Sequence, residues 1–326
     1  MLGDKVRVQQ KVISDYTDDQ LLFLKQMGVR YVYVMFKDEH TNYDSVMRFL
    51  DRLDHFGLAA TDGGNTSLYK NPAIHLALPG RDEAIARYNA FNRALGKAGI
   101  PVVYMTWEPN QVLTSRFAVG EETRGAIGRI VDIKELETHP YSHGRLYTKE
   151  EMWDNFQYFL DRVLPVCEEA NVKIALHPND PPVACLKGIS NLITSTEDYK
   201  HAFELSGNSP YLGMKMCIGC WLEGGNQFGD VLKDIQYFVE RKKILIVHFR
   251  NVSATVPYFE ETLLEDGYMD MYNVMKQFVI ADYDGTIHID HVPIYAESCG
   301  GEDSSIAYSL GYMKALLKCA MRDVNS

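Results

Sequence analysis

The chain alternates between strand-like and helix-like segments along most of its 326 residues. Eight short runs rich in β-branched and aromatic residues are each followed by a stretch with the apolar spacing of a helix. The predicted strands cover residues 6–8, 30–36, 58–61, 100–107, 172–176, 211–216, 244–247 and 286–289. Strict alternation indicates a parallel sheet, and eight units predict an α/β fold closed into a (β/α)8 TIM barrel. An open doubly wound sheet is the alternative, but no glycine-rich phosphate motif follows the first strand.

A single TIM-barrel domain over residues 1–326 is the expected organisation, because barrels of this length are common and no linker divides the chain. Residues 108–147 interrupt the alternation and are too long for an ordinary strand–helix connection. We therefore expect a long loop insertion there, either functional or disordered. Its arginines, which include Arg116 and Arg129, could help to bind an acid.

Composition excludes several classes of protein. A net charge of -11 argues against a nucleic acid or an anionic membrane as partner, since both require a basic surface. Six cysteines in 326 residues are too sparse for a disulfide framework. No apolar run approaches the ~20 residues of a membrane span, and the N-terminus lacks an apolar signal-peptide core. We expect a cytoplasmic protein.

Four consecutive predicted strands end in residues of the types that bind metals: His177, Cys217, His248 and Asp290. Catalytic residues of barrels lie at the C-terminal ends of strands, and neighbouring strands are only ~4.8 Å apart. Two imidazoles, a thiolate and a carboxylate have a formal charge that balances a divalent cation. Any one of the four alone could be a packed or hydrogen-bonded structural residue. Their joint placement predicts a metal site.

Other residues near these strand ends are candidates for catalysis. His291 directly follows Asp290 and could transfer a proton, although a surface histidine is the alternative. Arg250 could hold a carboxylate with two hydrogen bonds, or form a surface ion pair. Asn179 begins a loop stiffened by two prolines, which turn formation alone could explain. Cys220 could form a redox pair or half of a zinc site with Cys217, but core packing is the simpler interpretation.

At these positions the sequence resembles the mannonate dehydratase family, metal-dependent barrels of the xylose-isomerase-like group. The resemblance is clearest in the motifs around His177 (LHPNDPP), Cys217 (CIG), His248 (HFRNV) and Asp290 (DH), and in DGYMDMYNVM at 266–275. It implies the same four metal ligands, His291 as the catalytic histidine, and manganese as the ion. Iron(II), zinc and cobalt(II) are alternatives.

The chain departs from the family pattern at three places. The family's N-terminal Arg-Trp-Tyr/Phe-Gly signature is absent, and residues 6–10 read VRVQQ instead. His288 and Ile289 replace the Arg-Pro that precedes the family's Asp-His pair. Ile306 stands where the family has a catalytic tyrosine, with Tyr308 and Tyr312 nearby but out of register.

The resemblance implies a hydro-lyase of hexuronate catabolism that converts D-mannonate to 2-keto-3-deoxy-D-gluconate and water. The partner would be a small-molecule sugar acid, and the protein is expected to be a homo-oligomer. The substrate-binding candidates are Arg250, Asn179, Arg116, His288 and Tyr308. A metal-dependent sugar isomerase or epimerase and a non-catalytic sugar-acid binding protein remain alternatives, because the family tyrosine is missing.

Overall fold

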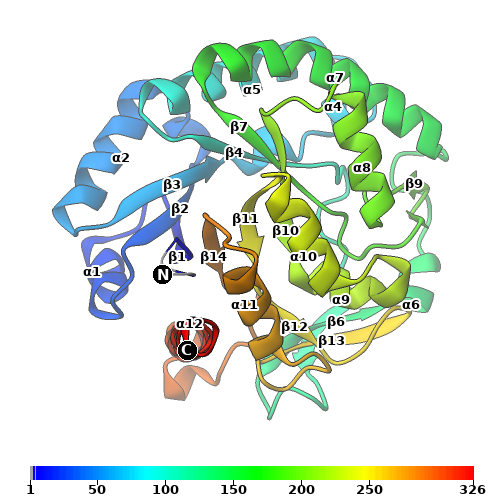
Figure 1. Ribbon diagram of the computed structural model, residues 1–326. Coiled ribbons are helices and arrows are strands. Elements are labelled where there is room, and N and C mark those ends of the chain that lie inside the picture. The colour runs from blue at the N-terminus through cyan, green and yellow to red at the C-terminus, as the bar shows by residue number, and fades with distance from the viewer. Residues whose placement is uncertain (1–2, 4) are drawn as a thin grey trace.

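A computed structural model describes residue 3 and residues 5–326, and within them eight parallel strands close into a barrel (Figure 1). Neighbouring strands follow chain order around the barrel, and the last strand pairs with the first. The strands are β1 (Arg7–Ile13), β2 (Tyr31–Met35), β3 (Ala59–Gly64), β4 (Val102–Thr106), β7 (Lys173–His177), β10 (Leu212–Cys217), β11 (Ile244–His248) and β14 (Thr286–His288). The predicted (β/α)8 barrel is confirmed.

Helices surround the barrel, and their apolar faces pack on the outer side of the strands (Figure 1). The long ones are α1 (Asp18–Gln26), α2 (Tyr43–His55), α5 (Arg81–Lys97), α7 (Lys149–Ala170), α8 (Thr196–Leu205), α10 (Val231–Glu240), α11 (Met271–Ile280) and α12 (Gly301–Asn325). The side chains of Thr17 and Thr148 close capping boxes at the starts of α1 and α7, as their sequences predict. None of the helices in the described part of the chain is long and apolar enough to cross a membrane.

Short helical segments lie in the connections between these elements. They are α3 (Thr66–Tyr69), α4 (Pro72–His75), α6 (Ile133–Glu137), α9 (Ile218–Gly224), η1 (Asp38–His40), η2 (Gly225–Gln227) and η3 (Glu297–Cys299). Of these, α9 begins directly after the last residue of β10.

The segment 108–147, expected to be a loop, contains β5 (Arg116–Val119) and β6 (Ile127–Asp132). These two strands form an antiparallel sheet with β12 (Asn251–Val252) and β13 (Tyr258–Thr262), in the order β12-β13-β6-β5. A separate small pair, β8 (Cys185–Leu186) and β9 (Ile189–Ser190), follows β7. The four-stranded insertion sheet therefore joins two distant connections of the barrel. The assignment of the whole chain to one domain stays a prediction.

The first strand is longer than predicted, extending from Arg7 to Ile13 rather than over residues 6–8. Its middle residues, Gln9, Gln10 and Lys11, are polar and do not have the apolar alternation of a core strand. The interior of this barrel is itself partly polar, and Gln9 is fully buried there. A small apolar cluster of Tyr33, Tyr104, Ala175 and Ile246 shares the interior with these groups.

The helix pair α5–α7 offers a test of the packing. A Cβ atom on Gly96 would lie 2.2 Å from the carbonyl oxygen of Ala170, whereas a Cβ on Gly311 in α12 would meet nothing within 4 Å. We expect Gly96→Ala to lower the free energy of unfolding by about 1–3 kcal/mol through overpacking. Gly311→Ala should raise it by up to about 1 kcal/mol through helix propensity. Chemical denaturation of both variants measures this, and equal shifts would contradict the close approach.

Candidate metal centre and cavity

The four predicted ligands lie together at the C-terminal ends of neighbouring strands. His177, Cys217 and His248 are the last residues of β7, β10 and β11, and Asp290 lies two residues after β14. These strands are consecutive in the barrel. One ligand atom from each of the four side chains lies within 4.8 Å of the others. The barrel therefore brings together the four residues that sequence spacing selected.

Each of the two imidazoles in the group has a ring nitrogen that is free to face an ion. His177 donates from Nδ1 to the carbonyl oxygen of Pro178 at 2.7 Å, which leaves Nε2 as the atom with a free lone pair. Neither ring nitrogen of His248 has a hydrogen-bond partner among the described residues, although its Nδ1 lies 3.1 Å from Oδ1 of Asp290. Buried ring nitrogens without partners cost free energy unless a ligand satisfies them. The donors present thus fit a bound cation.

The electrostatics also suit a cation. Burial would raise the pKa of the Cys217 thiol, but the Cys220 side chain and the Arg250 guanidinium outweigh it and hold the pKa well below its usual value. Burial likewise opposes ionisation of Asp290, whose pKa is lowered by nearby histidines and by Arg250. Burial lowers the pKa of His248 and favours its neutral form. Thiolate, carboxylate and neutral imidazole are the forms that bind divalent metals.

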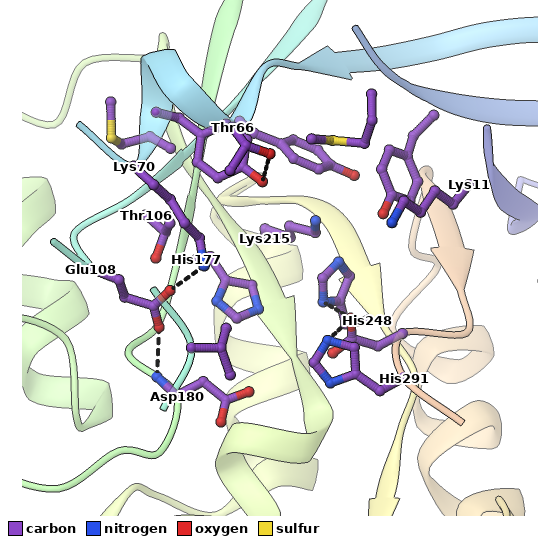
Figure 2. A pocket seen from close by; sticks show the side chains of 17 residues that line it. Lys11, Thr66, Lys70, Thr106, Glu108, His177, Asp180, Lys215, His248 and His291 are labelled. Atoms are coloured by element: carbon purple, nitrogen blue, oxygen red, sulfur yellow. Dashed lines mark hydrogen bonds and ion pairs between the residues drawn. The ribbon is translucent and has the colours of Figure 1, made fainter. Parts of the chain in front are cut away.

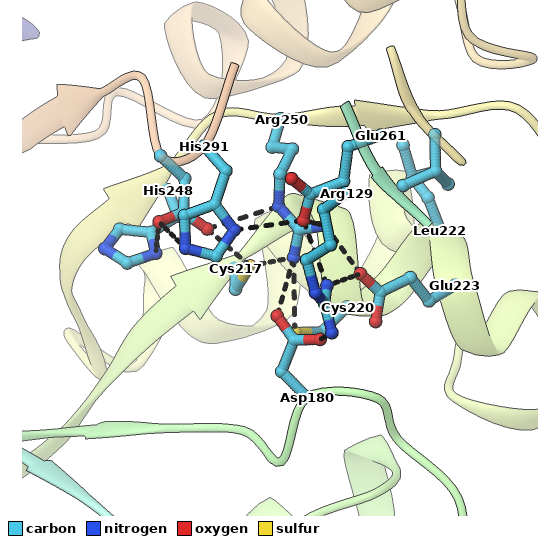
Figure 3. A network of polar contacts seen from close by, with 12 residues as sticks. Arg129, Asp180, Cys217, Cys220, Leu222, Glu223, His248, Arg250, Glu261 and His291 are labelled. Atoms are coloured by element: carbon cyan, nitrogen blue, oxygen red, sulfur yellow. Dashed lines mark hydrogen bonds and ion pairs between the residues drawn. The ribbon is translucent and has the colours of Figure 1, made fainter. Parts of the chain in front are cut away.

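Arg250 lies behind this group and is fully buried (Figure 3). Its Nη1 donates to Glu223 at 2.6 Å and to Glu261 at 2.9 Å, and its Nη2 donates to Asp180 at 3.0 Å. Its Nε donates to Asp290 at 3.2 Å. The guanidinium is therefore used by the protein itself. The expectation that Arg250 clamps the substrate does not match this placement, since Arg250 instead holds a candidate ligand in position.

Arg129 on β6 completes the buried network from the insertion sheet (Figure 3). Its Nη2 donates to Asp180 at 2.7 Å and its Nη1 donates to Glu261 at 2.9 Å. Both carboxylates also receive hydrogen bonds from Arg250. The insertion sheet is thereby attached to the metal group through charged contacts. In the sequence, Arg129 stands out only as one of several arginines in an expected loop.

A cavity of about 180 Å³ opens beside the four candidate ligands (Figure 2). Of the ligands, His177, His248 and Asp290 line it, together with His291. The other lining residues come mainly from the first strands and the segments that follow them: Lys11, Tyr33, Met35, Thr66, Tyr69, Lys70, Tyr104, Met105, Thr106, Glu108, Val112, Asp180 and Lys215. The lysines, hydroxyl groups and carboxylates among these residues suit a ligand with several oxygen atoms.

His291 lies at the edge of the cavity, and 43% of its side chain is exposed. Its Nδ1 is 3.0 Å from Oε1 of Glu261, and its Nε2 is 3.7 Å from Oδ1 of Asp290. Burial lowers the pKa of His291, but the charges of Asp290 and Glu261 outweigh it and raise the pKa to about 9. The ring is therefore held in orientation at a place that a ligand can reach.

The remaining substrate-binding candidates do not line the cavity. Asn179 is buried and bonds the carbonyl oxygen of Trp107 at 2.9 Å and the amide of Ile193 at 2.8 Å, so it fixes its loop. His288 is buried beside His248 on the neighbouring strand β14, with the two ring centroids 4.2 Å apart. Asn179 uses its amide within the protein, whereas Nε2 of His288 has no hydrogen-bond partner among the described residues, and neither residue lines the cavity.

Arg116 and Tyr308 lie further away. Arg116 is on β5, where its half-exposed guanidinium pairs with Glu135 at 3.0 Å. Tyr308 is on α12 and bonds Glu265. The cavity's tyrosines are instead Tyr33, Tyr69 and Tyr104 among the described residues. The missing family tyrosine thus has no replacement from α12 in the cavity lining.

Sequence reasoning missed several cavity residues. Glu108, just after β4, accepts from the backbone amide of Asp180 at 2.8 Å and pairs with Lys70 at 3.0 Å. Thr106 is the last residue of β4, and Lys215 lies two residues before Cys217 on β10. Residues two apart on a strand share a face. A metal ligand at the end of a strand therefore indicates that the residue two positions earlier also points into the barrel. That signal could have identified Lys215.

The buried network predicts unequal effects for two arginines of the insertion sheet. Arg129→Met would leave the buried carboxylates of Asp180 and Glu261 short of a partner, which typically costs about 3–5 kcal/mol. Arg116→Met removes an exposed pair worth about 0–1 kcal/mol. Thermal and chemical denaturation of both variants measures the difference. Similar small losses in both would show that the Arg129 contacts do not stabilise the fold.

Comparisons with known proteins agree with this architecture. The crystal structure of mannonate dehydratase from Streptococcus suis serotype 2 superposes with a TM-score of 0.86 at 24% identity, covering 98% of this chain and 96% of that chain. A xylose isomerase-like TIM barrel protein from Mycobacterium smegmatis, solved with magnesium, gives a TM-score of 0.63 at 12% identity over 98% and 99% of the two chains. At these identities the likeness shows the shared xylose-isomerase-like barrel.

Sequence comparison identifies the family. Mannonate dehydratase from Streptococcus pneumoniae is 30% identical over 274 residues, which cover 76% of this chain and 73% of the relative. The sequence model of D-mannonate dehydratase (UxuA) matches residues 128–323, a range that contains all four candidate ligands and His291. The chain belongs to the D-mannonate dehydratase family.

Proposed function

We propose that the protein is a metal-dependent hydro-lyase that converts D-mannonate to 2-keto-3-deoxy-D-gluconate and water. The observation that carries this proposal is the convergence of four metal-ligand side chains on a cavity that His291 also lines. Family membership supports the same reaction. Manganese is the proposed ion, following the family resemblance. Homo-oligomerisation and a cytoplasmic location stay predictions.

His177, Cys217, His248 and Asp290 would hold the ion. When bound, a divalent cation there supplies Lewis-acid binding for the substrate carboxylate and 2-hydroxyl, and stabilises the negative charge left by the C2 proton. Arg250 would act as a positioning residue, because it hydrogen-bonds Asp290 and lies 3.5 Å from Cys217 Sγ. The arginine would thereby keep both anionic ligands aimed at one point.

His291 would donate the proton that turns the departing 3-hydroxyl into water. Glu261 accepts from Nδ1 of His291, so Nε2 is the atom left to carry a transferable proton. Glu261 is itself fixed by Arg129 and Arg250. Arg250 thus fixes both Glu261, which orients the proton donor, and Asp290 of the ligand group.

The first test is a product assay on metal-loaded protein with a panel of hexonates. We expect a 2-keto-3-deoxy acid from D-mannonate, and loss of both bound manganese and product in Cys217→Ala. Cys167→Ala is the control, because Cys167 is equally buried but bonds Asn92 outside the cavity. Metal content measured by emission spectroscopy separates loss of the ion from loss of chemistry.

Other products would identify the alternatives. An isomerised or epimerised sugar without loss of water would favour the isomerase. If the manganese-loaded protein binds D-mannonate but forms no product from any hexonate, the non-catalytic binding protein would be the remaining alternative.

His291→Ala tests the proton donor separately. We expect kcat to fall roughly 10²–10⁴-fold, as for removal of a general acid, while D-mannonate binding and manganese content stay within a few-fold of the parent values. His139→Ala, an exposed histidine of the insertion, should change none of these. Steady-state kinetics and calorimetric titration give the comparison. A loss of binding as large as the loss of turnover would instead make His291 a binding residue.

A further inference from the structure

Among the described residues, three lysines line the cavity, and they differ in what their ammonium groups already contact. Lys70 is paired with Glu108 at 3.0 Å. Lys11 is exposed and also borders an outer hollow at the cavity mouth. Lys215 is only 4% exposed, and none of the described residues forms a hydrogen bond or ion pair with its Nζ. A buried ammonium with three unused hydrogen-bond donors costs free energy unless a ligand accepts those hydrogen bonds.

The surroundings of Lys215 direct its Nζ into the cavity (Figure 2). The atom lies 3.4 Å from the ring centroid of Tyr104 and 5.1 Å from that of Tyr33. Burial lowers the pKa of Lys215 to about 7, against the charges of Asp290 after β14 and Asp62 on β3, which raise it. Ring faces attract a cation but accept no strong hydrogen bond. The three hydrogens of Lys215 therefore remain available to a ligand.

Lys215 also stands next to the metal group. It precedes Cys217 by two residues on β10, so both side chains point into the barrel. On β4, the hydroxyl groups of Tyr104 and Thr106 are buried and have no hydrogen-bond partner among the described residues. Beside the ligand group, β4 and β10 thus offer one cation and two hydroxyls to which the described part of the chain gives no hydrogen bond or ion pair.

We propose that Lys215 binds the carboxylate of the sugar acid, taking the carboxylate oxygen that faces away from the metal group. The unpaired hydroxyls of Tyr104 and Thr106 complement the hydroxyl groups that such a substrate carries. As the C2 proton leaves, negative charge grows on the carboxylate, so a cation there stabilises the transition state more than the bound substrate. Lys215 is then a substrate-binding and catalytic residue. The inference rests on the proposed function for the identity of the acid.

The experiment uses the manganese-loaded full chain and Lys215→Met, which keeps the length of the side chain and removes its charge. Binding of D-mannonate and of its neutral amide, D-mannonamide, is measured by calorimetric titration, and turnover of D-mannonate by steady-state kinetics. We expect Lys215→Met to weaken D-mannonate binding roughly 10–100-fold, as for loss of a hydrogen bond to a charged group, and to leave D-mannonamide binding unchanged. A further fall in kcat should accompany it. Lys233→Met, on the surface of α10, is the matched control and should change nothing.

The outcomes separate this inference from the proposed function. Equal losses for acid and amide, or a shift in melting temperature without a change in binding, would overturn the carboxylate contact and leave Lys215 a structural residue. If the parent turns over D-mannonate and Lys215→Met does so with unchanged kinetics, the inference about Lys215 would be overturned and the proposed function would stand. If the parent binds D-mannonate without turning it over, and Lys215→Met loses that binding, the dehydratase would be overturned and the carboxylate contact supported. No binding in the parent would overturn both. Lys215→Gln replaces the methionine variant if that variant does not fold.

Discussion

The buried contacts of Arg250 are the constraint on which the rest of the site depends. Its guanidinium joins four carboxylates, which come from the loop after β7, from α9, from the insertion sheet and from the segment after β14. Charges without solvent are stable only when they are closely paired, so each partner has little freedom to move. Gly219 shows how tight the arrangement is, because a Cβ there would lie 2.4 Å from Cζ of Arg250. A glycine at this position lets the first turn of α9 pass the guanidinium and keeps Cys217 beside it.

The fold was predictable from the chain because strand-like and helix-like segments alternate along it, and most of the strands are apolar runs that pack under helices. The first strand was predicted too short for a physical reason. Its inward side chains, Gln9 and Lys11, belong to the polar interior and the cavity of the barrel, so the usual apolar alternation is missing there. The insertion sheet was missed because β5 has exposed residues such as Phe117, and because β13, which pairs with β6, lies far along the chain.

The candidate ligands were predictable because barrel topology alone brings the ends of adjacent strands together. The substrate-binding candidates were not, since they depend on how loops and long side chains lie in space. Arg116 and Arg129 occupy paired strands of one hairpin, yet one is half exposed and the other is buried against Asp180. Nothing local in the sequence separates them. Lys215 was overlooked because a lysine inside an apolar strand contradicts the pattern that defines the strand, and such local contradictions often mark functional positions.

Charge balance indicates which kind of ligand the cavity suits. Arg129 and Arg250 offset Asp180 and Glu261, and burial together with Asp180 raises the pKa of Glu223 well above its usual value, so Glu223 adds little negative charge. The thiolate of Cys217 and the carboxylate of Asp290 then remain, 3.8 Å apart, and a divalent cation neutralises them. With that cation bound and Lys70 paired to Glu108, the charged groups left on the cavity wall are cationic: Lys11, Lys215 and His291, whose pKa the nearby carboxylates raise. A neutral sugar would leave them uncompensated, whereas a sugar acid supplies the missing negative charge.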